Sequence, residues 1–309
     1  MKKCVLICNP TSGKGSKEKL TKEFQNILDE NGYETKTYFT KYSGHAGKIA
    51  YGLADDIDLL ISLGGDGTFS EVVAGNLERQ KKLLLSHIPL GTTNDLGAMF
   101  GMGKNPINNL KMILEGEVRS LDICEINGRS FVYVAGLGKF TNIAYDTPRK
   151  LKKNFGYLAY LIGAIKSFNR GTKTFEMEVT TTEETHKGLY TFILVCNASR
   201  MGGLDIFDDV KMNDGKIEVL MTNITKKKDI IKSLYLLTTS DITKVPGFYF
   251  FRTDYLKVKL NSLPRHNWCI DGEEFKSKDK EFELKVAHDV EMLLPSKELD
   301  KIFLDKANK

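Results

Sequence analysis

The stretch from Leu63 to Thr68, with the sequence Leu-Gly-Gly-Asp-Gly-Thr, points most directly to chemistry. An apolar run leads into it, and a helix-like pattern, Thr68–Leu77, follows it. A strand, a glycine turn and a helix N-terminus together suit phosphate, because glycines let the backbone approach closely and the helix offers unpaired N–H groups. Asp66 places a negative charge where phosphate would lie. The sequence therefore predicts a phosphate site that also needs a cation, either a metal or a lysine.

Two other polar turns share this character. Asn-Pro-Thr-Ser-Gly-Lys-Gly, residues 9–15, follows the apolar run Cys4–Cys8, and Pro-Leu-Gly-Thr-Thr-Asn-Asp, residues 89–95, follows the run Leu83–Ile88. Taken alone, each turn is also typical of a plain strand-to-helix connection with a polar N-cap. In open α/β sheets, ligands bind at the carboxyl ends of the strands. The edge that all three turns share is therefore more informative than any one of them.

The elements that must position these turns alternate between strand and helix over the first 120 residues. Strands are predicted at Cys4–Cys8, Tyr33–Thr40, Ile57–Leu63 and Leu83–Ile88. Helices are predicted around Leu20–Leu28, at Ser43–Ala54 and at Thr68–Leu77. Thr68 and Glu71 have the spacing of a capping box for the last of these helices. This order predicts an α/β domain with a parallel sheet, helices on both faces and right-handed crossovers.

From about Arg119 the pattern changes to short strand-like runs. Turn signals such as Asn127-Gly128, Asp214-Gly215 and Asp271-Gly272 separate them. The predicted strands are Leu121–Ile126, Phe131–Ala135, Phe175–Thr181, Leu189–Asn197, Lys216–Thr222, Tyr255–Leu260, Trp268–Ile270, Glu281–Val286 and Val290–Leu294. An apolar helix is predicted at residues 157–168 and a short amphipathic helix at Lys297–Ala307. The second half is therefore predicted to be an all-β sandwich or barrel with an inserted helix.

Composition narrows the classes of protein. The chain has 309 residues, of which 41% are hydrophobic and 28% charged, so disorder is not expected. Five scattered cysteines without C-x-x-C spacing favour buried thiols in a reducing cytoplasm. No run approaches the ~18 apolar residues of a membrane-spanning helix, and the N-terminal apolar segment is too short for a secretory signal. The net charge of +5 fits either an ordinary solvated surface or an anionic partner: lipid, nucleotide or nucleic acid.

Four segments, in this order, resemble the signatures of the diacylglycerol-kinase catalytic family, and of its bacterial soluble lipid kinases in particular. The segments are Asn9-Pro10-x-Ser12-Gly13-Lys14-Gly15, Gly64-Gly65-Asp66-Gly67-Thr68, Ile88-Pro89-x-Gly91-Thr92-x-Asn94-Asp95 and Ile270-Asp271-Gly272-Glu273. The second segment also occurs in NAD kinases, and phosphofructokinases have a related turn, but the four together are specific. Residues 155–160 resemble a further family segment, although proline is commoner where Tyr157 stands.

The resemblance implies a nucleotide-binding domain at residues 1–120, similar to that of NAD kinases and phosphofructokinases. Residues 295–309 would return to this domain, and residues 121–294 would form a β-sandwich lipid-acceptor domain across a cleft. ATP would donate its γ-phosphoryl group to a lipid hydroxyl, that of diacylglycerol in the similar Gram-positive enzymes. The implied nucleotide-binding residues are Asn9, Pro10, Thr11, Ser12, Gly13, Lys14, Thr40, Gly64, Gly65, Asp66, Gly67, Thr68, Glu71, Gly91, Thr92 and Asn94.

Two candidates exist for the cation beside Asp66. Lys14 could pair with it directly, whereas Asp66 and Asp95 together beside a triphosphate call for Mg²⁺. The resemblance adds a metal site at Asp214, completed by backbone carbonyls near Lys211 and Lys216. Without the resemblance, Asp214-Gly215 is more typical of a hairpin turn.

Asp271 and Glu273 are the candidates for the carboxylate that accepts the proton of the acceptor hydroxyl or positions that hydroxyl. Asp-Gly alone is more typical of a hairpin turn. The fourth signature favours a catalytic role, with Asp271 slightly preferred to Glu273.

A diacylglycerol acceptor would require work at the cytoplasmic face of a membrane. The apolar helix at residues 157–168 beside the cationic residues 149–153, and the cluster Phe248–Phe251, have suitable chemistry for an anionic surface. Burial in the core is the plainer interpretation of both. A nucleic-acid partner is not expected, and a homodimer is left open.

Three alternatives remain. The acceptor could be another lipid alcohol, such as a sphingoid base or phosphatidylglycerol. The chain could be an NAD kinase, against which the first and third turns argue. It could also be a non-catalytic nucleotide- or lipid-binding regulator, against which the intact Asp66, Asp95 and Asp271 argue.

Overall fold

The computed structural model describes residues 1–91, 93–138, 174–226, 228–229, 246–262, 267–297 and 299–305. Thr92, the segment at residues 155–160, the cationic residues 149–153 and the predicted helix at residues 157–168 lie outside the described residues. The chain forms two compact units, Met1–Leu121 with a C-terminal stretch from His288, and Asp122–Ala287. The return to the first unit therefore begins before residue 295, because the end of strand β18 (Glu281–Leu294) already pairs with a strand of that unit.

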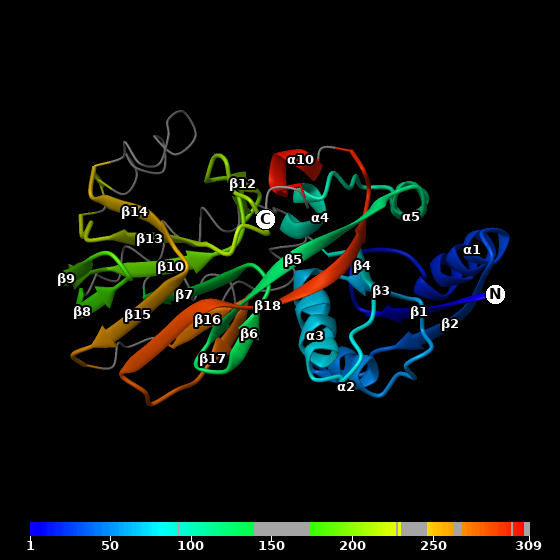
Figure 1. Ribbon diagram of the computed structural model, residues 1–309, viewed down its shortest axis with the longest axis horizontal. Coiled ribbons are helices and arrows are strands. Elements are labelled where there is room, and N and C mark those ends of the chain that lie inside the picture. The colour runs from blue at the N-terminus through cyan, green and yellow to red at the C-terminus, as the bar shows by residue number, and fades with distance from the viewer. Residues whose placement is uncertain are drawn as a thin grey trace. The chain divides into compact units, whose positions relative to one another are not determined.

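The first unit is built on a parallel sheet with the order β2-β1-β3-β4, beside which the end of β18 lies (Figure 1). Its strands are β1 (Lys2–Cys8), β2 (Tyr33–Phe39), β3 (Leu59–Gly64) and β4 (Leu85–Pro89). Its helices are α1 (Lys17–Glu30), α2 (His45–Tyr51), α3 (Asp66–Leu77), α4 (Asp95–Met99), α5 (Pro106–Leu114) and α10 (Leu299–Ile302). Helices on both faces explain why β3 and β4 are buried along their whole length and β1 along most of it, including the polar residues Ser62, Ser86 and His87. The predicted α/β class is confirmed.

The capping box predicted for α3 is wrong. The helix begins at Asp66, not Thr68, and its N-cap is Gly65, without a side-chain cap. The Glu71 carboxylate instead accepts hydrogen bonds from the amides of Gly44 (2.7 Å) and Ala46 (3.1 Å), at the start of α2. Because the N-cap of α2 is itself a glycine without a side chain, the cap is supplied from the neighbouring helix. The helix predicted at Ser43–Ala54 is α2, which is shorter than predicted and spans His45–Tyr51.

The chain's C-terminal helix is also shorter than predicted. Among the described residues of this segment, only Leu299–Ile302 is helical, as α10, although Leu299, Ile302 and Phe303 are buried as their apolar pattern indicated. The ring of Phe303 stacks on Phe100, 6.3 Å between centroids. The C-terminal segment therefore contributes to the core of the first unit.

The second unit contains two antiparallel sheets, as a sandwich requires. One joins the first half of β18 to β15, β8 and β9, and the other has the order β14-β13-β10-β7-β16-β17. The strands are β5 (Glu117–Ile126), β6 (Arg129–Phe131), β7 (Val134–Gly138), β8 (Phe175–Thr180), β9 (Thr185–Tyr190), β10 (Phe192–Cys196), β11 (Arg200–Met201), β12 (Leu204–Asp205), β13 (Ile217–Thr222), β14 (Phe248–Thr253), β15 (Tyr255–Leu260), β16 (Trp268–Ile270) and β17 (Glu273–Phe275). Buried residues of both sheets form one core, in which Trp268 packs on Phe282. The predicted sandwich is confirmed.

Two runs predicted as single strands are each two strands. Phe131–Ala135 is divided between β6 and β7, and Leu189–Asn197 between β9 and β10. At both places the chain leaves one sheet for the other. At the second crossing, the amide and hydroxyl of Thr191 both donate to the Thr222 carbonyl. Conversely, the two strands predicted between Glu281 and Leu294 are the single strand β18.

Two of the three Asp-Gly or Asn-Gly signals are two-residue hairpins. Asn127-Gly128 joins β5 to β6 and Asp271-Gly272 joins β16 to β17, with all four residues at positive φ. Asp214-Gly215 is not a hairpin, because it precedes β13, whose neighbours are β10 and β14.

All five cysteines are free and buried, as predicted. Within the described ranges, no helix has the length and apolar character needed to cross a bilayer.

Candidate functional site

The three polar turns of the first unit meet at the carboxyl ends of β1, β3 and β4. The Asn9 amide donates to the Leu63 carbonyl (2.9 Å), and its Nδ2 donates to Thr68 Oγ1 (3.2 Å). The Leu90 amide donates to the Gly64 carbonyl (2.6 Å). Two of these bonds are between backbone atoms, and together they join all three turns. The juxtaposition inferred from parallel topology is therefore present.

Glycine is required where the turns touch. A Cβ on Gly13 would lie 2.4 Å from the Leu90 carbonyl oxygen. A Cβ on Gly91 would lie 2.8 Å from the Gly65 Cα. Any side chain at these positions would push the turns apart, so the glycines let three backbones converge where a phosphate would be bound.

The first turn is organised by Asn9. Its Oδ1 accepts hydrogen bonds from the amide (3.0 Å) and hydroxyl (2.9 Å) of Thr11, and its carbonyl accepts from the Ser12 amide (3.2 Å). Pro10 and Lys14 are exposed. No ion pair joins Lys14 to Asp66 in the part of the chain that the structure describes. The pairing offered by the sequence as one source of the cation is therefore not observed.

Asp66 and Asp95 are the first residues of α3 and α4, and the structure brings them together. The Asp95 amide lies 3.3 Å from Asp66 Oδ2, and Asp95 is almost fully buried. Asn94 occupies the N-cap position of α4 in the left-handed region (φ 53°), but it makes no capping bond. Its Nδ2 donates to the Gly91 carbonyl (3.1 Å), while its buried Oδ1 meets no hydrogen-bond donor among the described residues. The plain N-cap interpretation of Asn94 is thus wrong.

These oxygen atoms fit a hard cation such as Mg²⁺. In the described ranges, no three acidic, histidine or cysteine side chains cluster closely enough to hold a metal by themselves. A magnesium ion here would complete its coordination with phosphate and water, as Mg²⁺ commonly does.

Thr40 lies beside the first turn, and Glu71 contacts the segment that follows Thr40. The Thr40 amide donates to the Cys8 carbonyl (2.9 Å), which places Thr40 next to the start of the Asn9 turn. Glu71 supports the segment that follows Thr40, because its carboxylate holds the amides of Gly44 and Ala46. Gly67 and Thr68 belong to the first turn of α3, where Thr68 is buried.

In the second unit, Asp271 and Glu273 have different surroundings. The Asp271 carboxylate, 9% exposed, accepts hydrogen bonds from the amides of Val132 (2.8 Å), Tyr133 (3.1 Å) and Val134 (3.0 Å). Glu273 is exposed, and its Oε2 lies 3.5 Å from Arg129. Asp271 is therefore fixed in place by backbone, and Glu273 sits at the surface.

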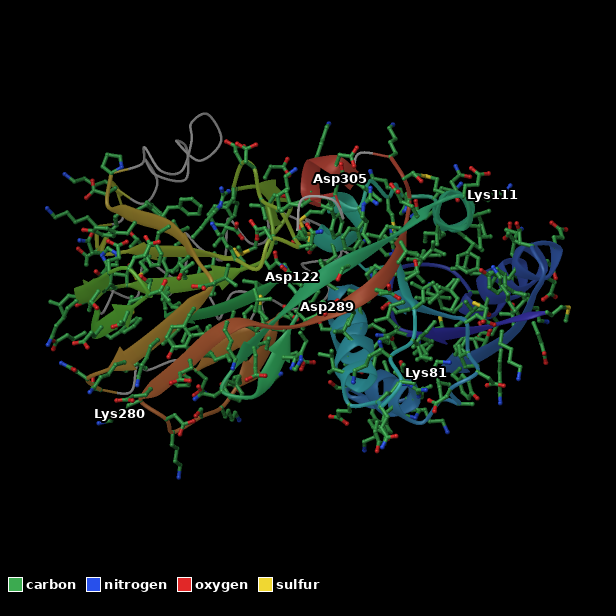
Figure 2. All side chains as sticks on the ribbon, in the orientation of Figure 1. Lys81, Lys111, Asp122, Lys280, Asp289 and Asp305 are labelled. Atoms are coloured by element: carbon green, nitrogen blue, oxygen red, sulfur yellow. The ribbon has the colours of Figure 1, made fainter. Side chains whose placement is uncertain are left out.

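The turn at Asp214, which was predicted to bind a metal, is held by the carboxylate of Asp122, a residue that the sequence did not single out. Asp122, on β5 (Figure 2), is 5% exposed and accepts a hydrogen bond from the Gly215 amide (2.7 Å). Asp214 Oδ1 accepts from the Lys216 amide (3.0 Å), and Lys211 lies at the start of the same turn. The available signal was an aspartate inside the apolar run Leu121–Ile126, where a buried charge needs a reason.

The aromatic cluster Phe248–Phe251 lies on β14. Tyr249 is exposed, while the three phenylalanines are partly buried. Phe250 stacks on Phe207 and Phe251 on His186. The plainer interpretation, burial in the core, therefore holds only in part: Phe250 and Phe251 pack on neighbouring rings, yet no residue of the cluster is fully buried.

Comparisons with known proteins agree with this arrangement. The family description "Diacylglycerol kinase catalytic domain" matches residues 3–126, and "YegS C-terminal NAD kinase beta sandwich-like domain" matches residues 131–286. A diacylglycerol kinase of Bacillus subtilis is 31% identical over 88% of this chain and 90% of that protein. One from Staphylococcus saprophyticus is 28% identical over 88% and 89%.

The fold has a solved counterpart. The crystal structure of a diacylglycerol kinase from Bacillus anthracis superposes with a TM-score of 0.74 at 20% identity, covering 95% of this chain and 97% of that one. At that identity the likeness shows the fold. The matched family domains and the similarity to the Bacillus subtilis enzyme over most of both chains go further: this chain belongs to the diacylglycerol kinase catalytic-domain family.

Proposed function

We propose that the protein transfers the γ-phosphoryl group of ATP to the hydroxyl of diacylglycerol, giving phosphatidic acid. The observation that carries this proposal is the convergence of three glycine-containing turns with Asp66, Asp95 and the buried Asn94 Oδ1. The turns offer backbone N–H groups to the phosphates. Mg²⁺, when bound, supplies neutralising charge on the β- and γ-phosphate oxygens.

On this proposal, Asp271 rather than Glu273 receives the acceptor hydroxyl. Three backbone amides fix the orientation of the Asp271 carboxylate. A carboxylate held in one orientation suits a hydroxyl that must keep a constant position, which is what phosphoryl transfer requires. Glu273, by contrast, is exposed, with its Oε2 3.5 Å from Arg129 Nη2.

A labelling experiment tests the reaction. Wild-type protein is incubated with γ-labelled ATP, Mg²⁺ and mixed acceptors. Label in organic-extracted phosphatidic acid is the expected result. Label in another phospholipid would change the acceptor and keep the chemistry, label in NADP would replace the proposal with NAD kinase, and no transfer would favour a binding protein.

Two matched variants test the carboxylates. We expect Asp271→Asn to lower kcat by about 10²–10⁴-fold with little change in ATP affinity, because a neutral amide cannot take up the proton of the hydroxyl. Glu273→Gln should remain within about tenfold of wild type. Circular dichroism of both variants checks their folding. Near-normal turnover of folded Asp271→Asn would contradict the assignment.

A further inference from the structure

A buried lysine lies beneath the turn that follows β1. Lys17, the first residue of α1, is only 4% exposed. Its Nζ donates to the carbonyls of Lys14 (2.9 Å) and Gly15 (3.3 Å). Lysine is almost never so completely buried without a specific partner. The backbone of the turn supplies hydrogen-bond acceptors, but no negative charge.

These two hydrogen bonds determine which way the peptides of the turn face. In a trans peptide, the C=O and N–H groups point in opposite directions. The amides of Gly15 and Ser16 belong to the peptides whose carbonyls face Lys17, so these N–H groups point away from the ammonium. Within the described residues, the amides of Gly13, Lys14, Gly15 and Ser16 donate no hydrogen bond. Successive outward N–H groups of this kind form an anion-binding concavity.

Among the described residues, no carboxylate lies within ion-pair distance of the Lys17 ammonium. Glu18, the acidic residue of the same helical turn, is exposed and accepts a hydrogen bond from Ser16 Oγ (2.8 Å). A cation in the first turn also opposes the helix dipole. A buried positive charge thus stands behind a row of outward N–H groups.

We propose that Lys17 is a positioning residue for phosphate binding. It holds the carbonyls of the turn inward, so that the amides face outward, and it supplies charge that a bound triphosphate neutralises. The proposal rests on the nucleotide-dependent function above. It assigns to Lys17 a cationic role at this turn that the sequence had offered to the exposed Lys14.

The test uses full-length protein and two probes, ATP and inorganic tripolyphosphate. Lys17→Met removes the charge and keeps an apolar stem of similar length. Lys19→Met, on the same helix and exposed, is the matched control. We expect Lys17→Met to weaken binding of both probes by about 10- to 50-fold, since a weakly screened charge is lost. Lys19→Met should stay within about twofold, because exposed charges are strongly screened.

Rescue separates charge and positioning from simple packing. Lys17→Arg retains the cation and should recover part of the tripolyphosphate affinity. In turnover assays, the KM for ATP should rise by more than kcat falls in Lys17→Met. A folded Lys17→Met that binds tripolyphosphate like wild type overturns the proposal, and so does a wild type that binds none.

If Lys17→Met fails to fold, wild-type protein still decides the matter. With ¹⁵N labelling, the amides of Gly15 and Ser16 should shift on addition of tripolyphosphate, and binding that leaves both unshifted overturns the proposal. Absence of lipid phosphorylation, with the Lys17 effects on tripolyphosphate intact, would remove the proposed function and leave this inference standing. If wild type phosphorylates lipid and folded Lys17→Met binds tripolyphosphate like wild type, this inference fails and the proposed function stands.

Discussion

Glu218 is a buried acid whose protonation is linked to folding. It lies on β13, 1% exposed, with Oε1 3.1 Å from Arg252 Nε. Its Oε2 is buried and meets no donor in the described part of the chain. Burial raises the pKa of Glu218 to about 7, although the charge of Arg252 partly opposes this effect. The folded state therefore holds this proton more tightly than the unfolded state does.

The stability that the Glu218 proton contributes decreases as pH rises. Stabilisation from the Glu218 proton is fully present below the ordinary pKa of 4.5 and is lost as pH rises through about 7. We expect urea unfolding to show wild type losing about 3 kcal/mol of stability, relative to Glu218→Gln, between pH 4 and pH 8. EDTA removes any contribution from metal at the neighbouring turn. Parallel pH profiles for the two proteins would contradict this linkage.

Residue types alone could not assign Glu71, Lys17 and Asp122. The spacing of Glu71 from Thr68 satisfies the rule for a capping box. Its carboxylate instead accepts hydrogen bonds from the start of α2, 25 to 27 residues earlier in the chain. Lys17 lies in a run of polar residues that gives no sign of burial. Asp122 has its partner 93 residues away, at Gly215. In each case the decisive contact is tertiary, and local pattern carries no information about it.

Among the elements, α2 and α3 lie side by side, with a glycine of each helix at the contact (Figure 1). A Cβ on Gly75 of α3 would lie 2.1 Å from the Gly47 carbonyl oxygen of α2. A Cβ on Gly47 would lie 2.8 Å from the Glu71 carbonyl oxygen. Both obstacles are backbone and cannot rotate aside. This contact brings the start of α2 within reach of the Glu71 carboxylate.

Alanine substitutions on α3 test this crossing. We expect Gly75→Ala to lower the free energy of unfolding by about 2 kcal/mol, although alanine favours a helix by about 1 kcal/mol over glycine. Gly67→Ala on the same helix is the control, since no atom lies within 4 Å of its added Cβ. That control should be neutral or stabilise by about 0.5–1 kcal/mol. Equal effects from the two variants in urea melts would show that the helices do not constrain each other.

The sequence predicts the boundaries of an element well where an apolar run ends at a clear turn signal. The strands of the parallel sheet and the hairpins at Asn127-Gly128 and Asp271-Gly272 follow from apolar runs and turn chemistry. The crossings between sheets at Val132–Tyr133 and at Thr191 do not, because the flanking residues remain apolar and strand-like. Only the partner strands distinguish a crossing from a continuous strand.

At the scale of the whole molecule, the sequence predicts the order of strands and helices, but it predicts the arrangement of the site only in part. Alternation of strand and helix in the sequence predicts three turns at one edge of the sheet, and the structure brings them together there. The roles of Asp271 and Glu273 could not be separated from the sequence. The backbone that surrounds the Asp271 carboxylate comes from residues 132–134, far along the chain.

The charge of the whole molecule supports a prediction about membranes. With a net charge of +5, the protein should bind liposomes more strongly as the fraction of anionic lipid increases. Binding should fall with added salt, because the Debye length shrinks from about 10 Å at 0.1 M to about 3 Å at 1 M. Co-sedimentation with neutral liposomes is the control. Binding indifferent to both lipid charge and salt would contradict an electrostatic interfacial role.

The three amide hydrogen bonds to Asp271 give this residue a structural role as well as the proposed catalytic one. The carboxylate fastens the segment where the chain leaves one sheet for the other, so selection for a stable fold alone would preserve it. A descendant that had lost all activity would still be expected to carry this aspartate. Its presence in a relative is thus poor evidence of turnover. On the proposed function, Asp66 and Asp95 would be better markers of an active enzyme.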